Sequence, residues 1–496
     1  MSRIKLEDLK TYLWGSAQLL RSNIDAGAYK QYIFPLLFFK RICDVYDEEE
    51  INAFKTYGKD AKDFSDDEIH MFIVPKGYHW KDVRETTTDV GLAIITAFRE
   101  IEKANGDKLL GVFGDAAWTN KNRLPDRLLK DLIEHFSSQT LSLENCPEDE
   151  LGQGYEYLVR KFADDSGHTA QEFYTNRTVV HLMTEMLEPK SGESIYDPTC
   201  GSAGMLISTI AHLKNKKLEW RNVSAYGQEI NSLTSSIGKM NLFLHGIKDF
   251  KIINDDTLKR PAFIEYGRLK KFDMILANPP YSISQWDRTA FESDPYGRNF
   301  LGVPPQSRAD YAFIQHILCS LNDNTGRCAI LLPHGVLFRK EEQTIRENLV
   351  KSDLLECVIG IGKNLFFNSP MEACIMICRT NKTPNKKGKI LFINAKEMVT
   401  RKNGFSYLEN HHIEIITKAY RDFDNKETFS SVRTIGEIIA NDSNLSIPLY
   451  IDSVSNNGEV DDISLLDSYL TWKDSSNMIS ENIKDILKII GGEDNE

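Results

Sequence analysis

Seven short apolar segments between residues 194 and 379 dominate the hydrophobic pattern of the chain. Stretches with helical spacing separate most of them. Alternation of strands and helices predicts a parallel sheet with helices on both faces. Lys389–Asn394, just after Gly388, predicts an additional edge strand. The seven predicted strands are Ser194–Asp197, Val223–Gln228, Lys251–Asn254, Phe272–Asn278, Cys328–Pro333, Leu355–Ile361 and Ala373–Arg379.

Residues 1 to about 155 follow a different pattern, in which apolar side chains recur at helical spacing. Pro35 lies within one such face and should start or kink a helix. The two clearest faces are Tyr29, Tyr32, Ile33, Leu36 and Leu37, and Leu128, Leu129, Leu132 and Phe136. No cluster of acids, bases or nucleophiles stands out here. We expect a helical scaffold with partner contacts; a clamp on DNA or on a partner is the alternative.

After about residue 400 the chain becomes mixed and polar, and it ends in a candidate helix. Ser480 would cap its amino end and Gly491 its carboxyl end. The apolar side consists of Ile479, Ile483, Ile486, Leu487 and Ile490. The acidic linker Ser453–Asp462 favours partner binding by this helix over docking on its own domain. These patterns divide the chain into a helical domain (1–155), a sheet domain (156–440) and an acidic tail (441–496).

Composition narrows the class of protein. A chain of 496 residues suits two or three domains, and 41% hydrophobic and 27% charged residues are typical of a soluble globular protein. Cys374 and Cys378 share an apolar strand without a second ligand pair, which favours core packing and no metal site. The scattered cysteines fit a reducing cytosol. No signal peptide or membrane span is expected, so we predict a cytoplasmic protein.

Charge argues against tight stand-alone binding to DNA. The net charge is −12, but residues 441–496 hold twelve Asp or Glu and three Lys, a local −9. The rest of the chain therefore carries only −3 of the total. A body without excess positive charge should receive any nucleic-acid substrate from a partner.

The predicted strand Phe272–Asn278 ends abruptly in Asn278, Pro279, Pro280 and Tyr281. Prolines cannot continue a ladder, so a stiff turn is expected at the carboxyl end of the strand, where open α/β sheets bind ligands. The side-chain oxygen of Asn278 and the backbone carbonyl of Pro279 can both accept hydrogen bonds from one exocyclic amino group. Tyr281 can stack on the ring that carries this amino group. The alternative is an Asx-Pro turn with Tyr281 as a lid on the core.

Such a turn suits methyl transfer to an amino nitrogen. The lone pair of an aromatic amine is delocalised into the ring, and two acceptors on its hydrogens localise it. Fixed dipoles then stabilise the positive charge that develops on nitrogen, and the remaining contribution is alignment. No strong general base is needed, because the amine becomes acidic once methylated. The same turn also occurs in enzymes that act on glutamine side chains.

A second turn follows the first predicted strand, which ends at Asp197. Its small residues are Gly201, Ser202, Ala203 and Gly204, and the glycines let the backbone approach a ligand. Glu229 ends the second strand, 25 residues beyond Gly204, where Rossmann-like sites place a ribose-binding carboxylate. The alternative role for Glu229 is an acid at a helix N-terminus.

The missing motifs help to choose a cofactor. Neither Gly-x-Gly-x-x-Gly nor Gly-Lys-Ser/Thr is present, which counts against pyrophosphate cofactors and a P-loop. S-adenosylmethionine, with ribose and adenine but no phosphate, fits. Asp256 can hold its adenine amino group or be a solvated turn acid. Gln171–Arg177 can close over its methionine end through an aromatic pair and Thr175, although as a bare pattern it is a capped helix start.

As a set, these motifs resemble the modification (M) subunit of type I restriction–modification systems, a DNA adenine-N6 methyltransferase. The matching segments are Glu172–Arg177, Asp197–Leu206, Glu229, Asp255–Leu258, Asn278–Tyr281, Asp310–His316 and Leu332–Arg339, with others at Leu13-Trp14, Leu20-Arg21, Phe38–Arg41 and Asn441–Ile447. The resemblance covers most of the chain. Gln171 and Asn176 replace a glycine and a proline usual in the family, and Ala203 replaces a frequent glycine.

The resemblance implies a Rossmann-like, seven-stranded, S-adenosylmethionine-dependent methyltransferase sheet after a helical domain. It implies an adenine flipped out of duplex DNA and a separate specificity subunit that reads the sequence. A second copy of the chain and a translocating restriction subunit are the other implied partners. The implied cofactor contacts are Glu172, Phe173, Tyr174, Thr175, Asn176, Arg177, Ser202–Gly204 and Glu229.

Two alternatives remain open at this stage. An enzyme of the same chemistry can act on cytosine N4 or on protein glutamine, and a catalytically silent scaffold can retain the same body for assembly alone. Phe366 or Phe367 is a candidate for a second ring that stacks on the base, unless both are buried in the core.

Overall fold

The computed structural model describes residues 3–58, 60, 64–165, 175–363, 365, 372–402 and 405–451. The chain as far as Ile451 forms one compact unit. The predicted features outside the described residues include the terminal helix capped by Ser480, the linker Ser453–Asp462, and the rings of Phe366 and Phe367. The domain boundaries predicted from sequence stay predictions.

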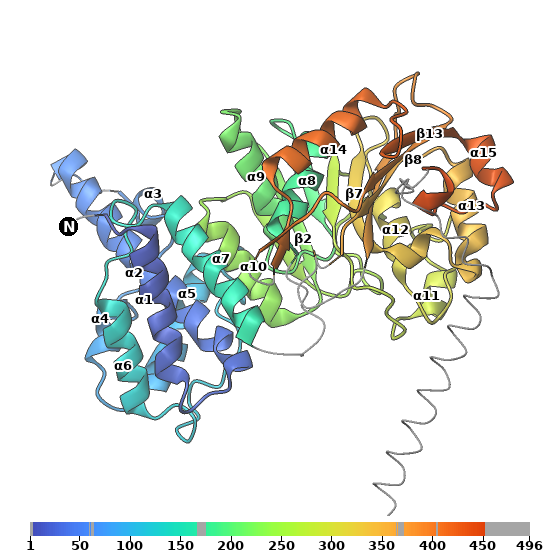
Figure 1. Cartoon of the computed structure of the whole chain (residues 1–496). Coiled ribbons are helices and arrows are strands. Elements are labelled where there is room, and N and C mark those ends of the chain that lie inside the picture. Colours follow the sequence, from blue (N-terminus) through green and yellow to red (C-terminus); the bar gives the residue numbers. More distant parts are fainter. Residues whose placement is uncertain are drawn as a thin grey trace, which may run out of the picture. The chain divides into compact units, whose positions relative to one another are not determined.

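The first part of the chain is helical, as predicted (Figure 1). Both predicted apolar faces are largely buried, Leu128 being half-exposed. Pro35 lies inside α2, beyond its first turn, so it does not start that helix. The helices are α1 (Leu6–Leu20), α2 (Lys30–Tyr57), α3 (Asp66–Ile69), α4 (Trp80–Glu85), α5 (Val90–Asn105), α6 (Asp126–Ser137) and α7 (Glu148–Asp165).

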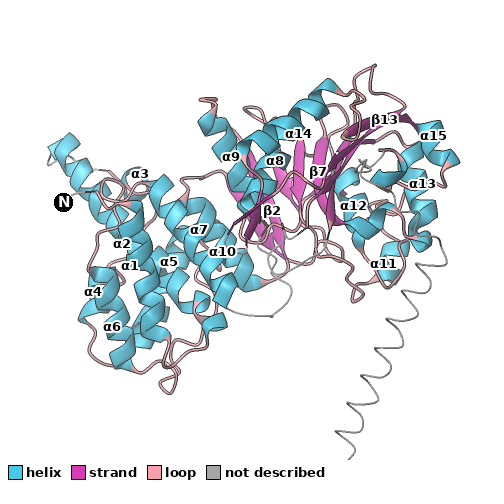
Figure 2. Ribbon diagram, in the orientation of Figure 1, coloured by secondary structure: helices cyan, strands magenta, loops and turns pink. Residues whose placement is uncertain are grey.

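A nine-stranded sheet forms the second part, in the order β13-β10-β8-β9-β7-β6-β1-β2-β3 (Figure 2). All seven predicted strands are present within two residues at each end. Two small hairpins, β4 (Ile264–Glu265) with β5 (Arg268–Leu269) and β11 (Thr400–Lys402) with β12 (Phe405–Tyr407), lie outside the sheet. The sheet strands are β1 (Ser194–Asp197), β2 (Ser224–Glu229), β3 (Phe250–Asn254), β6 (Met274–Ala277), β7 (Arg327–Pro333), β8 (Leu355–Ile361), β9 (Ala373–Arg379), β10 (Lys389–Ala395) and β13 (Ser430–Thr434).

The sheet is mixed, whereas the pattern predicted a parallel one. β9 runs antiparallel to both β7 and β8. Only eleven residues connect Ile361 to Ala373, and a parallel connection needs a crossover of a dozen or more. β10 is present but is not an edge strand, because the unpredicted β13 pairs antiparallel with its outer side.

Helices cover both faces of the sheet. One face carries α8 (Arg177–Leu187), α9 (Gly204–Asn215) and α14 (Asn410–Asp422). The other carries α12 (Asp310–Cys319), α13 (Gln343–Lys351) and α15 (Ile435–Ala440). The short helix α11 (Arg288–Glu292) lies in the chain between β6 and α12. Cys374 and Cys378 are fully buried in β9, as core packing requires.

One helix of the sheet region belongs to the core of the helical region. α10 (Ser232–Leu244) contributes Ile237, Met240, Phe243 and Leu244 to the apolar cluster built by the helices before α8. The Phe243 ring lies 5.9 Å from that of Phe38 and 4.9 Å from that of Phe72. α10 therefore anchors the sheet region to the apolar core of the helical region.

A buried ion pair lies at the amino ends of the central strands of the sheet. Arg327, at the start of β7, donates to both carboxylate oxygens of Glu193, at 3.0 and 2.7 Å. It also donates to the carbonyls of Leu187 and Glu188 at the end of α8. The Arg327 guanidinium thus links the end of α8 to the starts of β1 and β7. This is the opposite end of the strands from the predicted site.

Candidate active site

The predicted site residues gather at the carboxyl ends of three neighbouring strands. β1 pairs in parallel with β2 and with β6. In this register Asp197 lies opposite Gly227, and Tyr196 lies opposite Ile275. Asp197, Glu229 and Asn278 therefore leave the sheet at one edge, as predicted for an open α/β sheet.

The loop between β1 and α9 requires its glycines. Gly201 has φ of 51°, and Ala203, the N-cap of α9, has φ of 63°. A Cβ on Gly201 would meet no atom within 4 Å, so the backbone faces open space there. A Cβ on Gly204 would lie 1.9 Å from Nη1 of Arg177, so a larger residue there would displace that guanidinium. Ser202 is held by its carbonyl, which accepts from Asn241 at 2.8 Å.

Glu229 ties this loop to the next helix. One carboxylate oxygen accepts from the Gly201 N–H at 3.0 Å and the other from the Asn231 N–H at 2.8 Å. Asn231 is the N-cap of α10, so Glu229 precedes the helix and is not part of its first turn. Each oxygen keeps capacity for a further donor, such as a ribose hydroxyl.

Asp197 is the most perturbed acid of the site. It is 2% exposed and accepts from the Thr199 N–H at 3.0 Å. Burial, with a smaller contribution from the negative charge of Glu229, raises the pKa of Asp197 to about 8. A cation bound beside Asp197 would favour the ionised form of this carboxyl group.

The loop after β3 brings Asp256 to the same region. Oδ1 of Asp256 accepts from the N–H groups of Leu258 and Lys259, the arrangement of a turn acid. Thr257 anchors the loop by donating to the Pro198 carbonyl. Arg298, buried in the segment after β6, donates to the carbonyls of Thr257 and Leu258 at 2.9 and 2.8 Å. A pocket of about 430 Å³ opens beside this loop, lined by Asp256, Leu258, Lys259, Gln285, Trp286 and Asp287.

The turn after β6 presents an acceptor. Nδ2 of Asn278 donates to Oγ1 of Thr175 at 2.9 Å. Oδ1 of Asn278 is buried and receives no hydrogen bond from the described residues. Pro279 is buried, and the half-buried ring of Tyr281 packs against the apolar cluster on the α8 side of the sheet. Burial raises the pKa of Tyr281 well above its usual value, so its ring stays a neutral phenol.

The segment upstream of α8 is described from Thr175 onward, so Glu172, Phe173 and Tyr174 lie outside the described residues. Asn176 is the N-cap of α8; its Oδ1 accepts from the Thr178 N–H, and its amide donates to the Ser406 carbonyl. Arg177 forms an ion pair with Glu156 of α7. The predicted capped helix start is present, and Thr175 is the residue of this segment that contacts Asn278.

Sequence reasoning assigned no role to a charged cluster behind Tyr281. Asp310, at the start of α12, accepts from the N–H of Ser282 and pairs with Arg339. Both residues lie in segments quoted for the family resemblance, which was the available signal. Their partners lie 28 and 29 residues away, and no local pattern links them.

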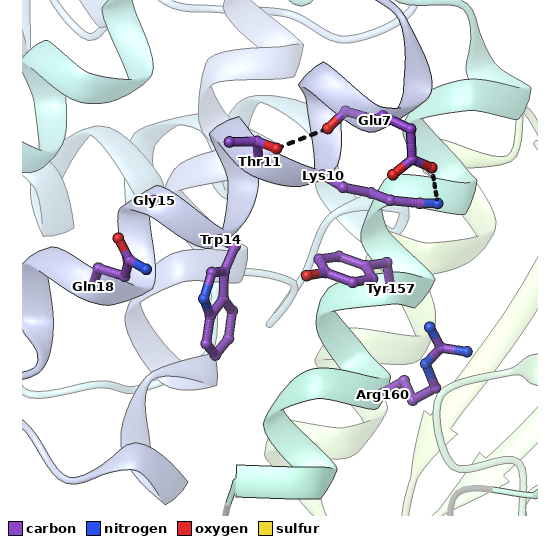
Figure 3. A pocket seen from close by; sticks show the side chains of 8 residues that line it. All are labelled: Glu7, Lys10, Thr11, Trp14, Gly15, Gln18, Tyr157 and Arg160. Carbon is purple, nitrogen blue, oxygen red and sulfur yellow. Dashed lines mark hydrogen bonds and ion pairs between the residues drawn. The ribbon is translucent and has the colours of Figure 1, made fainter. Parts of the chain in front are cut away.

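A second pocket, of about 290 Å³, lies between α1 and α7 (Figure 3). Trp14, Tyr157 and Arg160 face it, and its charged residues Glu7 and Lys10 pair with each other at 2.6 Å. It contains no residue set suited to group transfer. In the described ranges there is also no group of three His, Cys, Asp or Glu placed to hold a metal ion. No helix among those described is long and apolar enough to span a membrane.

Known protein families and structures resemble this chain over most of its length. The family model described as N-6 DNA Methylase matches residues 147–459, and the HsdM N-terminal domain model matches residues 9–136. The type I restriction enzyme MjaVIII methylase subunit of Methanocaldococcus jannaschii is 31% identical, over 93% of this chain and 81% of its own length. The MjaIX methylase subunit of the same organism is 27% identical over 98% and 92%. Among solved structures, a type I restriction-modification methyltransferase subunit from Streptococcus thermophilus gives a TM-score of 0.78 at 29% identity, covering 90% of this chain and 100% of that one.

Proposed function

This chain belongs to the N-6 DNA methylase family, among the methylase subunits of type I restriction enzymes, and we propose that its Asn278–Tyr281 turn is where adenine N6 is methylated. It is an adenine-specific DNA methyltransferase and the modification subunit of a type I system. Membership in this family does not favour cytosine N4 or protein glutamine as the target.

The buried Oδ1 of Asn278 is the observation that carries the proposal. No described residue donates to this oxygen. A buried acceptor without a donor costs free energy, which favours a ligand that supplies one. Thr175 takes up the amide N–H, which leaves the oxygen for the target. An adenine amino group, which has two N–H donors, supplies that partner.

The turn's residues then divide the work. Asn278 Oδ1 and the Pro279 carbonyl accept the two amine hydrogens, so the nitrogen lone pair is drawn out of the ring and directed at the methyl group. Pro280 stiffens the turn, and Tyr281 stacks on the flipped base. As the methyl carbon bonds to nitrogen and its bond to the donor sulfur breaks, with the electron pair left on sulfur, positive charge develops on nitrogen beside two fixed oxygen dipoles, which stabilise it. The extra proton then leaves to solvent.

The cofactor of this reaction is S-adenosylmethionine, which supplies a methyl group activated by a sulfonium. The loop between β1 and α9 fits it, because Gly201 faces open space beside the Glu229 carboxylate. We assign the ribose to Glu229, the positive charges of the methionine end to the neighbourhood of Asp197 and Thr175, and the adenine to the loop of Asp256. Gly201, Ser202, Ala203 and Gly204 let the backbone approach. Glu172, Phe173, Tyr174, Asn176 and Arg177 complete the proposed cofactor contacts.

Partners supply what this chain lacks. Its net charge of −12 does not favour DNA unaided, so a separate specificity subunit should deliver and read the duplex. A second copy of the chain and a restriction or translocating subunit are proposed to complete the assembly, in the cytoplasm.

Asn278→Ala tests the assignment. In the assembled complex, single-turnover methylation should fall by about 10²–10³, the loss typical of removing one preorganised polar group. Cofactor affinity, measured by calorimetry, should be unchanged, and the wild-type product should be N6-methyladenine by mass spectrometry. Asn322→Ala, at a turn between α12 and β7, is the matched control. Equal rates in wild type and Asn278→Ala would refute the role of this turn.

A further inference from the structure

Ser282, directly after Tyr281, has a left-handed backbone with φ of 51°. Residues with a Cβ disfavour this conformation, because the Cβ approaches a carbonyl oxygen. Such a residue persists where surrounding groups hold it, and held residues of this kind cluster at functional sites. Because Ser282 ends the turn that carries Asn278 and Tyr281, its backbone sets the direction in which that turn leaves the sheet.

Two charged side chains from distant segments hold Ser282. Asp310 is 1% exposed; it accepts from the Ser282 N–H at 2.9 Å and from the Ser282 hydroxyl at 3.3 Å. Arg339 donates to Asp310 at 2.9 Å and to the Ser282 hydroxyl at 3.1 Å. These four contacts, here called the clamp, join the turn, the start of α12 and the segment that follows β7.

Arg339 is itself fixed in place. A Cβ on Gly335 would lie 2.6 Å from its guanidinium, so a glycine is needed for the close approach. The Arg339 carbonyl accepts from Arg346 at 2.9 Å, and the fully buried Glu342 lies 3.6 Å from Nη1. If the guanidinium turned away, two buried carboxyl groups would lose their cation, which is strongly unfavourable.

We propose that Asp310 and Arg339 are positioning residues for methyl transfer, which hold Ser282 left-handed and so keep Asn278 and Tyr281 in the arrangement that receives the base. The inference rests on the proposed function of that turn. Neither side chain is required to touch the base or the cofactor; each acts through the backbone of Ser282.

The decisive experiment combines Asp310→Asn with Ser282→Gly. Asp310→Asn should lower the single-turnover methylation rate by at least about tenfold, with the cofactor Kd within about twofold of wild type. The double variant should recover most of that loss, because glycine adopts the left-handed backbone without the clamp. A purely structural role would not produce this recovery. Arg339→Lys, which keeps the charge but loses the fork, should show a smaller loss.

Glu193→Gln is the matched control, since it removes the partner of a buried two-pronged arginine at the opposite edge of the sheet. It should lower Tm about as much as Asp310→Asn and leave the methylation rate unchanged. If Asp310→Asn loses cofactor binding in step with rate, or if Ser282→Gly restores nothing, the clamp is overturned.

Hydrogen exchange separates the clamp from the function on which it rests. In Asp310→Asn, a peptide covering residues 279–286 should exchange faster, because a neutral amide oxygen accepts the Ser282 N–H more weakly than the carboxylate and no longer forms an ion pair with Arg339. A wild-type complex that methylates no DNA would overturn the proposed function. In that case faster exchange would still support the clamp, and unchanged exchange would overturn it as well.

Discussion

Tyr281 offers the most direct measurement at the scale of single residues. Stacking of a base on an aromatic ring is worth about 1–3 kcal/mol, so Tyr281→Ala should weaken capture of the flipped base by roughly 5- to 150-fold. A fluorescent 2-aminopurine at the target position reports that capture. Tyr281→Phe keeps the ring and should remain close to wild type. Equal losses of base capture and cofactor affinity in Tyr281→Ala would contradict the assignment.

Asp197 should make cofactor binding depend on pH. Its pKa of about 8 in the folded chain means that the carboxyl is largely protonated at pH 7. A cationic cofactor favours the ionised form, so binding should release a proton, and affinity should rise by up to about tenfold per pH unit until pH 8. Calorimetry in two buffers of different ionisation enthalpy measures the release. Asp197→Asn should bind with little dependence on pH, and a flat profile in the wild type would count against this coupling.

The raised pKa of Asp197 also determines how the stability of the cofactor-free chain changes with pH. The folded chain holds the Asp197 proton more tightly than the unfolded chain does. The contribution of Asp197 to the free energy of unfolding therefore falls as pH rises from about 4 to about 8, and is constant outside that window.

Site residues that stand at the ends of apolar strands could be predicted from sequence. Site residues whose partners lie far away in the chain could not. Gly201, Glu229 and Asn278 each end or follow an apolar strand, and strand ends in an open sheet converge on one edge. Nothing near Asp310 in the sequence indicates Ser282 or Arg339. The bond between Asn278 and Thr175 spans 103 residues and likewise needs the folded chain.

At the scale of elements, hydrophobic runs located the strands but not their directions. Buried parallel and antiparallel strands are both continuously apolar, as β7 and β9 are, so periodicity cannot distinguish them. The length of the connection between β8 and β9 carries that information. β13 was missed because its burial fades from Ser430 to Thr434 and its sequence, Ser-Ser-Val-Arg-Thr, has no apolar run.

At the scale of the whole molecule, the shared helix α10 limits how the chain can be divided. A fragment that begins at residue 147 would expose the α10 side chains that pack on Phe38 and Phe72. We expect it to bind a hydrophobic dye and to self-associate in sedimentation, because large exposed apolar patches promote association.

Phe243→Ser provides the matched comparison for that fragment. It should improve the solubility of the fragment, yet lower the free energy of unfolding of the full chain by about 3–5 kcal/mol, as for other large core aromatics. A fragment that stays monomeric and binds no dye would show that α10 does not need the helical region.

The Arg327–Glu193 fastening has an evolutionary consequence. The pair holds one end of the strands by charge, while Oδ1 of Asn278 at the other end receives no hydrogen bond from the described residues. Changes at the ion pair should lower stability, and changes at Asn278 should lower the methylation rate. Effects at well-separated positions combine almost independently. Substitutions at Asn278 can therefore alter the chemistry in this lineage while the contribution of the Arg327–Glu193 pair to folding is kept.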